Sequence, residues 1–299
     1  MDKSAEISDL VEEHVNDGDT IFVGGFGHCV PFALCFEIIR QGKRDLTLCR
    51  SGTDILFDIM IGAGVASKVI FGYLGNPGIG LGHAFRRAVE AGTLTYEDWT
   101  NMSMILRFEA ARQGIPFLPA RILQLGDIAN ASIPGTIEVK TIDCPYTSEK
   151  LACIPALKPD VALVHAHQSD RSGNVQLIGV DGDMFTGALA SEKILVTVER
   201  FVDTARITRL PEATRIPAYR TTAVAAVPWG AHPSYVEGVY GRDDDQYFAY
   251  DREARDVEGL EDYLRRWIYN CANHSAYLNA VGKKRLNVLE EQASRREIG

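Results

Sequence analysis

The sequence lacks the short motifs on which several large classes of protein depend. Its six cysteines form no Cys-x-x-Cys pair, so neither a zinc knuckle nor a thioredoxin-type redox motif is present. No Gly-x-x-x-x-Gly-Lys-Ser/Thr loop occurs, which excludes a Walker-type ATPase. The apolar runs fall far short of the roughly 20 residues that a membrane helix needs, and the first ten residues contain no apolar signal-peptide core. We therefore expect a soluble cytoplasmic protein with reduced thiols.

Positive charge is also in short supply. The 299 residues include 31 Lys and Arg against 40 Asp and Glu, which gives a formal net charge of −9. Binding of nucleic acid without sequence preference needs clustered cations that replace counterions, so nucleic acid is not an expected partner. An acidic surface still allows an anionic small substrate, because a binding site can be locally positive.

The apolar segments that are present predict an α/β fold. The expected strands are apolar throughout, as is typical of strands that helices cover on both faces, and helical patterns separate them. The strands are expected at 20–23, 46–48, 69–74, 161–164, 194–198 and 223–227, and the clearest helices at 7–15, 32–39 and, after a capping-box pattern at 95–98, up to Gly114. We expect a largely parallel sheet flanked by helices, in a single domain over 1–299 whose residues from about 257 form a helical tail.

The sharpest local feature is a glycine loop directly after the first expected strand, Gly24-Gly25-Phe26-Gly27. Glycine lets a ligand approach main-chain N–H groups closely, and ligands of open α/β sheets bind beyond the carboxyl ends of strands. The spacing differs from Gly-x-Gly-x-x-Gly, which argues against a dinucleotide loop. In a binding loop, a side chain at Gly25 would block the substrate and leave the fold intact. In a purely structural turn, it would destabilise the fold.

Three more glycine-bearing segments follow apolar runs, at 51–54, 75–78 and 125–127. Several such loops on one edge of a sheet would form a crevice lined by backbone donors, which suits a carboxylate or a thioester oxyanion. The candidate binding residues are Gly24, Gly25, Phe26, Gly27, Gly75, Asn76 and Gly126.

No complete catalytic or metal-binding set accompanies these loops. His165 and His167 lie on the same side of a strand, but a third ligand with recognisable spacing is missing, so we expect no metal site and two hydrogen-bonded histidines. Cys29 is typical of a buried core thiol. Glu199 is expected to form an ion pair with a neighbouring arginine, and 242–245 to be a solvated turn. The residues alone predict an α/β protein with a donor-lined crevice.

Segments along nearly the whole chain also match a known family. In the first half these are 17–19, 24–26, 36–42, 45–47, 85–87, 90–98 and 116–119, and in the second half 160–162, 165–168 and 173–175. The most specific are Gly230-Ala231-His232-Pro233-Ser234 and Tyr277-Leu278-Asn279 with Gly282 and Arg285-Leu286. Together they resemble the alpha (A) subunit of class I coenzyme A-transferases, in the glutaconate CoA-transferase branch. The chain departs from the family at 27–30, which lacks the usual longer insertion before the proline.

The resemblance implies an active site at the interface of an alpha and a beta subunit of similar fold. A beta-subunit glutamate in a Ser-Glu-Asn-Gly-like motif attacks the acyl-CoA thioester, giving an acyl–glutamyl anhydride and then a glutamyl–CoA thioester. This chain has Ser148-Glu149-Lys150 and Ser191-Glu192-Lys193 but no such motif. No catalytic residue is therefore expected in this chain, and the glycine loop would position the substrate.

The expected activity is that of a CoA-transferase (EC 2.8.3-type) subunit in a heteromer with a beta subunit. It would move CoA between an acyl-CoA and a (di)carboxylic acid, with the coenzyme A thioester as substrate and no tightly bound cofactor. The alternatives are a ring-opening CoA-thioester hydrolase of steroid catabolism, a decarboxylase of the same fold, or a non-catalytic ligand-binding protein. The resemblance places a carboxylate of the ring-opening branch just after Trp99. Here 100–102 contains no acid, which favours transfer.

Overall fold

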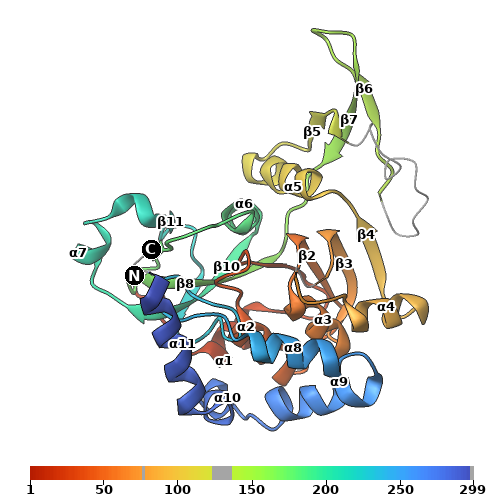
Figure 1. Cartoon of the computed structure of the whole chain (residues 1–299). Coiled ribbons are helices and arrows are strands. Elements are labelled where there is room, and N and C mark those ends of the chain that lie inside the picture. Colours follow the sequence, from red (N-terminus) through yellow and green to blue (C-terminus); the bar gives the residue numbers. More distant parts are fainter. Residues whose placement is uncertain (76–77, 123–136, 297–299) are drawn as a thin grey trace.

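The computed structural model describes residues 1–75, 78–122 and 137–296 (Figure 1). A nine-stranded sheet forms its centre, and seven of the strands run parallel in the order β12-β10-β8-β1-β2-β3-β4. They are β1 (Thr20–Val23), β2 (Leu46–Gly52), β3 (Ala66–Tyr73), β4 (Thr95–Asp98), β8 (Val161–Ser169), β10 (Lys193–Phe201) and β12 (Ala223–Ala226). The short strands β9 (Val175–Gln176) and β11 (Thr214–Ile216) continue antiparallel from the end of β8.

Helices cover both faces of this sheet, as the apolar strands predicted. Because side chains alternate along a strand, Ile21 of β1 belongs to one buried cluster and Phe22 to the other. The first cluster includes residues of α1 (Ile7–His14), α2 (Phe32–Arg40), α3 (Ile55–Gly62) and α4 (His83–Glu90). The second includes residues of α5 (Asn101–Gln113) and α6 (Met184–Ala190). The predicted class, a largely parallel sheet flanked by helices, is confirmed.

The beginning of α5 differs from the prediction. Thr95–Asp98 is strand β4, which pairs with β3, although its sequence has the form of a capping box. The actual cap is Thr100, whose hydroxyl accepts a hydrogen bond from the Ser103 N–H while the Ser103 side chain bonds back. Residues 95–98 could form either a helix cap or a strand, and pairing with β3 at the sheet edge selects the strand. The predicted end at Gly114 is correct, and this residue adopts φ 72°.

The C-terminal helices begin earlier than residue 257. They are α8 (Asp244–Glu253), α9 (Val257–Leu264), α10 (His274–Val281) and α11 (Lys283–Arg296), with a π-helical turn at Arg265–Tyr269. The expectation of a solvated turn at 242–245 is wrong, because the buried Asp243 caps α8 by accepting a hydrogen bond from the Gln246 N–H. None of the helices in the described residues is both long and apolar enough to cross a bilayer.

A small antiparallel sheet projects from the main body (Figure 1). It consists of β5 (Phe117–Ala120), β7 (Lys150–Pro155) and β6 (Thr141–Asp143), in that order. On the opposite flank of the main sheet, the short helix α7 (Thr204–Ile207) and a 3₁₀ turn at Pro211–Ala213 precede β11.

Candidate functional site

A cleft of about 270 Å³ lies at the carboxyl ends of β1, β2 and β3. This is the edge at which open α/β sheets bind their ligands. The glycine loop supplies Phe26 and Gly27, and the end of β2 supplies Arg50. The first residue of α5, Asn101, and Tyr247 of α8 close the other sides. Four parts of the chain, the glycine loop, β2, α5 and α8, thus meet at one cavity.

The glycine loop divides into a packed half and an exposed half. Gly24 is buried, and its N–H donates a hydrogen bond to the Leu163 carbonyl at 2.8 Å. Gly25 is buried at φ +86°, and a Cβ there would lie 2.6 Å from Cα of Val30. Phe26 is 46% exposed, and Gly27 is exposed with no atom within 4 Å of a Cβ placed there. Gly24 and Gly25 therefore shape the loop, and the next two residues face the cleft.

The remaining candidate glycine segments contribute less. Gly75 is buried, and its N–H donates to Oγ1 of Thr53 at 3.2 Å. Thr53 lines the cleft, so Gly75 supports the wall from behind. Asn76 and Gly126 lie outside the described residues.

Arg50 of β2 holds the glycine loop by a hydrogen bond to its backbone. Its side chain is buried, Nη1 donates to the Gly24 carbonyl at 3.1 Å, and Nε lies 3.7 Å from Oδ1 of Asp183. The other oxygen of Asp183 accepts a hydrogen bond from the Ser51 N–H at 2.9 Å. A buried charge of this kind needs a partner, and the ion pair locks the loop to the N-terminus of α6. Sequence reasoning missed Arg50, although a cation between the predicted strand at 46–48 and the glycine segment at 51–54 was a signal that could have found it.

Asp54, which lines the cleft, is hydrogen-bonded to a tyrosine of α8. The Tyr247 hydroxyl donates to its two carboxylate oxygens, at 3.0 and 3.1 Å. Burial raises the pKa of Asp54, although the hydrogen bond from Tyr247 and the nearby Arg50 oppose the shift. Burial also raises the pKa of the Tyr247 hydroxyl, and the Arg242 guanidinium lies 5.1 Å from the centre of its ring. The cleft therefore combines two guanidinium groups with a carboxylate that is hydrogen-bonded to tyrosine.

Asn101 lies in the stretch where the ring-opening branch is expected to carry an acid. It is the first residue of α5 and lines the cleft. The chain packs closely here, since a Cβ at Gly72 would lie 2.5 Å from the Asn101 backbone nitrogen. A carboxamide can donate and accept hydrogen bonds at neutral pH, but it is not a general base.

His165 and Glu199 belong to a hydrogen-bonded network. His165 Nε2 lies 2.8 Å from a Glu199 oxygen, and the Tyr240 hydroxyl donates to the same oxygen at 2.8 Å. The predicted arginine partner of Glu199 is wrong, since the pair is with histidine. His167 Nε2 bonds to the Glu237 carbonyl at 2.9 Å. Across the described ranges, no group of three His, Cys, Asp or Glu is placed to hold a metal ion.

The motifs that best marked the resemblance meet in a structural cluster. His232 Nδ1 lies 2.6 Å from the Tyr277 hydroxyl, and Nε2 lies 3.1 Å from an Asp243 oxygen. The Ser234 hydroxyl donates to the Gly27 carbonyl at 3.0 Å. The cluster therefore supports the glycine loop without lining the cleft itself.

Comparison with known proteins identifies the family. Residues 5–226 match the family model described as coenzyme A transferase. The chain belongs to the coenzyme A transferase family. It is 39% identical over 274 residues to the A subunit of 3-oxoadipate CoA-transferase from Pseudomonas knackmussii, covering 91% of this chain and 95% of that protein. It is 32% identical over 300 residues to the A subunit of glutaconate CoA-transferase from Acidaminococcus fermentans, covering 96% and 94%.

The fold of this coenzyme A transferase chain agrees with those matches. The crystal structure of glutaconate coenzyme A-transferase from Acidaminococcus fermentans superposes with a TM-score of 0.90 at 31% identity, covering 96% of this chain and 95% of the other. A subunit of a cholesterol ring-cleaving hydrolase from Rhodococcus jostii is 29% identical over 304 residues, covering 98% of each. The resemblance inferred from the sequence motifs is confirmed.

Neither serine–glutamate pair of this transferase chain reaches the cleft. Glu149 is exposed on the projecting sheet and pairs with Arg121 at 2.6 Å. Glu192 is exposed before β10 and pairs with Lys158 at 3.3 Å. Cys29 is buried, and burial raises the pKa of its thiol well above the ordinary value, so the thiolate needed for attack is suppressed.

Proposed function

We propose that this chain is the alpha subunit of a CoA-transferase that moves CoA between an acyl-CoA and a mono- or dicarboxylic acid, together with a beta subunit. The observation that carries the proposal is the cleft at the carboxyl edge of a coenzyme A transferase fold. The carboxylate in this cleft, Asp54, accepts hydrogen bonds from Tyr247, so the nucleophile is expected from the partner. Two relatives with higher identity than the hydrolase subunit are named as the A subunits of CoA-transferases.

In this proposal the nucleophile comes from the partner, as the family resemblance implies. A carboxylate oxygen of the partner attacks the thioester carbonyl, and the carbon–sulfur bond breaks to release the CoA thiolate. The thiolate then attacks the resulting anhydride at the partner's carboxyl carbon, which releases the acyl group as a carboxylate. The acceptor acid reverses both steps. This chain would supply the guanidinium groups of Arg50 and Arg242, which already pair with Asp183 and Asp244, and the amide of Asn101. Their N–H groups favour the developing oxyanion and bound carboxylates.

The roles of the candidate binding residues follow from their positions. Phe26 and Gly27 would contact the substrate, since they are exposed to the cleft. Gly24 and Gly25 would act indirectly by keeping the loop tight, and Gly75 would hold Thr53. Substrate contacts for Asn76 and Gly126 are proposed from the sequence alone.

The test is to trap the covalent intermediate and find the subunit that carries it. The chain and a beta subunit are co-expressed, incubated with acyl-CoA, and treated with borohydride, which reduces an enzyme–CoA thioester. Mass spectrometry should find the reduced glutamate in the beta subunit, and the isolated chain should transfer no CoA. A trapped residue in this chain, or full activity without the partner, would disprove the proposal. Release of free CoA without an acceptor would indicate a hydrolase.

We also infer that residues 1–299 form one domain, because C-terminal residues such as Tyr250 and Leu289 belong to the two sheet-covering clusters. A cytoplasmic location is proposed on the basis of its six free cysteines, which are typical of a reducing compartment.

A further inference from the structure

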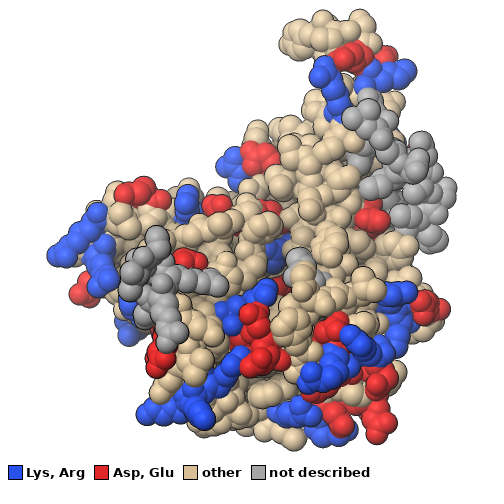
Figure 2. Space-filling view, viewed as in Figure 1, with Lys and Arg blue, Asp and Glu red and all other residues tan. Residues whose placement is uncertain are grey.

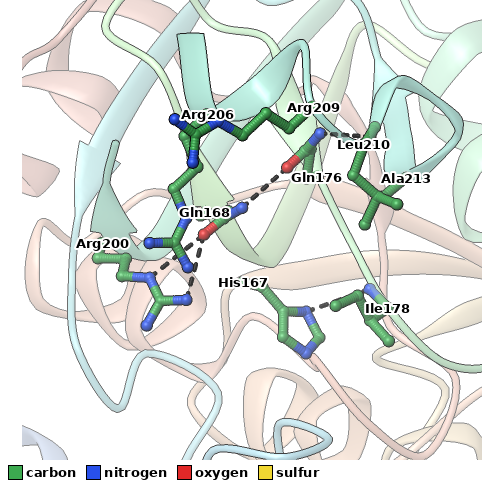
Figure 3. Close-up of a pocket in the computed structure, with 9 residues that line it drawn as sticks. All are labelled: His167, Gln168, Gln176, Ile178, Arg200, Arg206, Arg209, Leu210 and Ala213. Carbon is green, nitrogen blue, oxygen red and sulfur yellow. Dashed lines mark hydrogen bonds between the residues drawn. The ribbon is translucent and has the colours of Figure 1, made fainter. Parts of the chain in front are cut away.

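A second, larger cavity lies on the same edge of the sheet. Its volume is about 440 Å³, and it is lined from the ends of β8 and β10 and from the segment that contains α7 (Figure 3). His167 of its wall lies 6.5 Å, between ring centres, from His28 of the segment that follows Gly27. The cleft over β1 to β3 and this cavity over β8 and β10 therefore flank the glycine loop.

Three arginines line the second cavity, and none has an acidic partner among the described residues. Arg200, Arg206 and Arg209 are all exposed. Within the described ranges no carboxylate lies within salt-bridge distance of any of them, although Asp203 and Glu212 are close in sequence. Figure 2 shows basic side chains exposed over α7 on a protein whose formal net charge is −9. Neighbouring like charges repel one another, so a bound anion would be stabilised here.

One of the three guanidinium groups is held in place by neutral amides. Arg200 donates from Nε and from Nη2 to the Gln168 side-chain oxygen, each at 3.2 Å. Gln168 in turn donates to the Gln176 oxygen at 2.8 Å, and Gln176 donates to the Leu210 carbonyl at 2.8 Å (Figure 3). This chain of amides orients the Arg200 charge without neutralising it.

The histidine in the wall adds no charge. His167 Nε2 bonds to the Glu237 carbonyl, and Nδ1 accepts a hydrogen bond from the Ile178 N–H at 3.4 Å. Burial lowers the pKa of His167 to about 4, so the imidazole is neutral near pH 7. Electrostatic attraction to a ligand in this cavity therefore comes from the arginines.

The rest of the wall is apolar. Ile178 is 55% exposed and Leu210 is 43% exposed, although both are large aliphatic residues, and Ala213 lies beside them. Exposed aliphatic surface next to unpaired guanidinium groups suits a ligand that has both an apolar part and an anionic group.

We propose that this cavity binds an anionic group, phosphate or carboxylate, that is carried on an apolar stem. Guanidinium forks bind both groups by paired charge-assisted hydrogen bonds, and Ile178, Leu210 and Ala213 would cover the stem. The anion could belong to coenzyme A, through its phosphates, or to a medium-chain dicarboxylic acid. The inference depends on the cavity's own residues and holds whether or not the chain is a transferase subunit.

The experiment measures binding to the full chain by isothermal titration calorimetry with three probes: coenzyme A, adipate and inorganic phosphate. The test variant combines Arg206→Gln with Arg209→Gln, because neither side chain donates a hydrogen bond to another described residue. Its Kd for at least one probe should rise about tenfold or more, because the charge-assisted hydrogen bonds from two guanidinium groups to the anion are lost. Loss of coenzyme A and phosphate binding identifies phosphate as the anion, and loss of adipate binding identifies carboxylate.

Two further variants keep the result interpretable. Arg252→Gln removes an exposed arginine of α8 that lies outside the cavity, and it should leave every Kd unchanged. Leu210→Glu keeps the three arginines but places a competing carboxylate beside them, and it should weaken the same probe. Kd values within twofold of the parent in both cavity variants, or absence of binding of all three probes at millimolar concentration, would overturn the proposal.

Discussion

The carboxylate of Asp243 joins His232 to Arg285. One oxygen lies 3.1 Å from His232 Nε2, and the other accepts a hydrogen bond from Arg285 Nη2 at 2.5 Å. Burial by itself would raise the pKa of this carboxyl, but the hydrogen bonds from His232 and Arg285 keep the pKa below its ordinary value. Two motifs that are separated in the sequence, together with the beginning of α8, are thus fixed by a single side chain.

Replacing Asp243 should therefore lower the free energy of unfolding. Asp243→Ala leaves His232 Nε2 without its acceptor and removes the cap of α8. Loss of one member of a buried pair costs about 3–5 kcal/mol. Urea denaturation of the full chain measures the loss. The matched control is Asp245→Ala. Asp245 also pairs with Arg285, but its side chain is 81% exposed, so its loss should lower the free energy of unfolding by less than about 1 kcal/mol. Equal losses in the two variants would contradict the assignment.

The glycine loop should respond differently at its two ends. Gly25→Ala brings a Cβ to 2.6 Å from the backbone of Val30 at φ +86°, and the combined cost of overpacking and of a left-handed backbone is about 2–5 kcal/mol. Gly27→Ala meets no atom within 4 Å at φ +71°, so only the backbone cost of about 1–2 kcal/mol applies. Chemical denaturation measures the free energy of unfolding of both variants. A larger loss for Gly27→Ala than for Gly25→Ala would refute the prediction. Of the two roles that the sequence allows for Gly25, the structure thus favours that of a structural turn.

Asn101 should affect turnover and not stability. Asn101→Ala removes the amide from the cleft, and an unmade hydrogen bond to a bound substrate costs about 1–3 kcal/mol, so kcat/KM of the co-purified heteromer should fall about 5- to 150-fold. The control is Met102→Ala, the next residue of α5, which is 51% exposed and does not line the cleft. Thermal melting should be the same for both variants. If kcat/KM of the Asn101 variant equalled that of the control, the amide would have no role in the cleft.

Stability should decrease as the pH falls below about 6.5. His274 is buried with Nε2 2.9 Å from the Pro228 carbonyl, and burial lowers its pKa to about 4. Between the ordinary histidine value and about 4, the unfolded chain binds a proton that the folded chain does not. Each such group therefore removes up to about 1.4 kcal/mol of unfolding free energy per unit of acidification. His274→Gln should reduce the slope of unfolding free energy against pH by that amount, and parallel profiles for parent and variant would show that His274 does not contribute.

Apolar patterning was enough to predict the central sheet. The run at 20–23 became β1 with the same bounds, because a strand buried on both faces is marked by its own composition. The cleft could not be predicted in the same way. Asp54 and Tyr247 are 193 residues apart in the sequence, and nothing local to either residue indicates that they meet. The glycine loop was visible, but its division into packed and exposed halves depends on Val30 and on Leu163 of β8.

The pairing of β1 with β8 also determines when the protein can fold. The Thr20 N–H at the beginning of β1 donates to the Asp160 side chain, 140 residues later, and the strands are paired from Ile21 with Val161 onward. A ribosome adds roughly 5–20 residues per second, so one edge of the central strand waits roughly 7–28 s for its neighbour. Any sheet that β1 to β4 form during that time has an open apolar edge at β1, and such an edge is a site for misassociation. Non-local pairing of this kind also slows refolding of the complete chain, so synthesis at low temperature or with a chaperone should increase the yield of native protein.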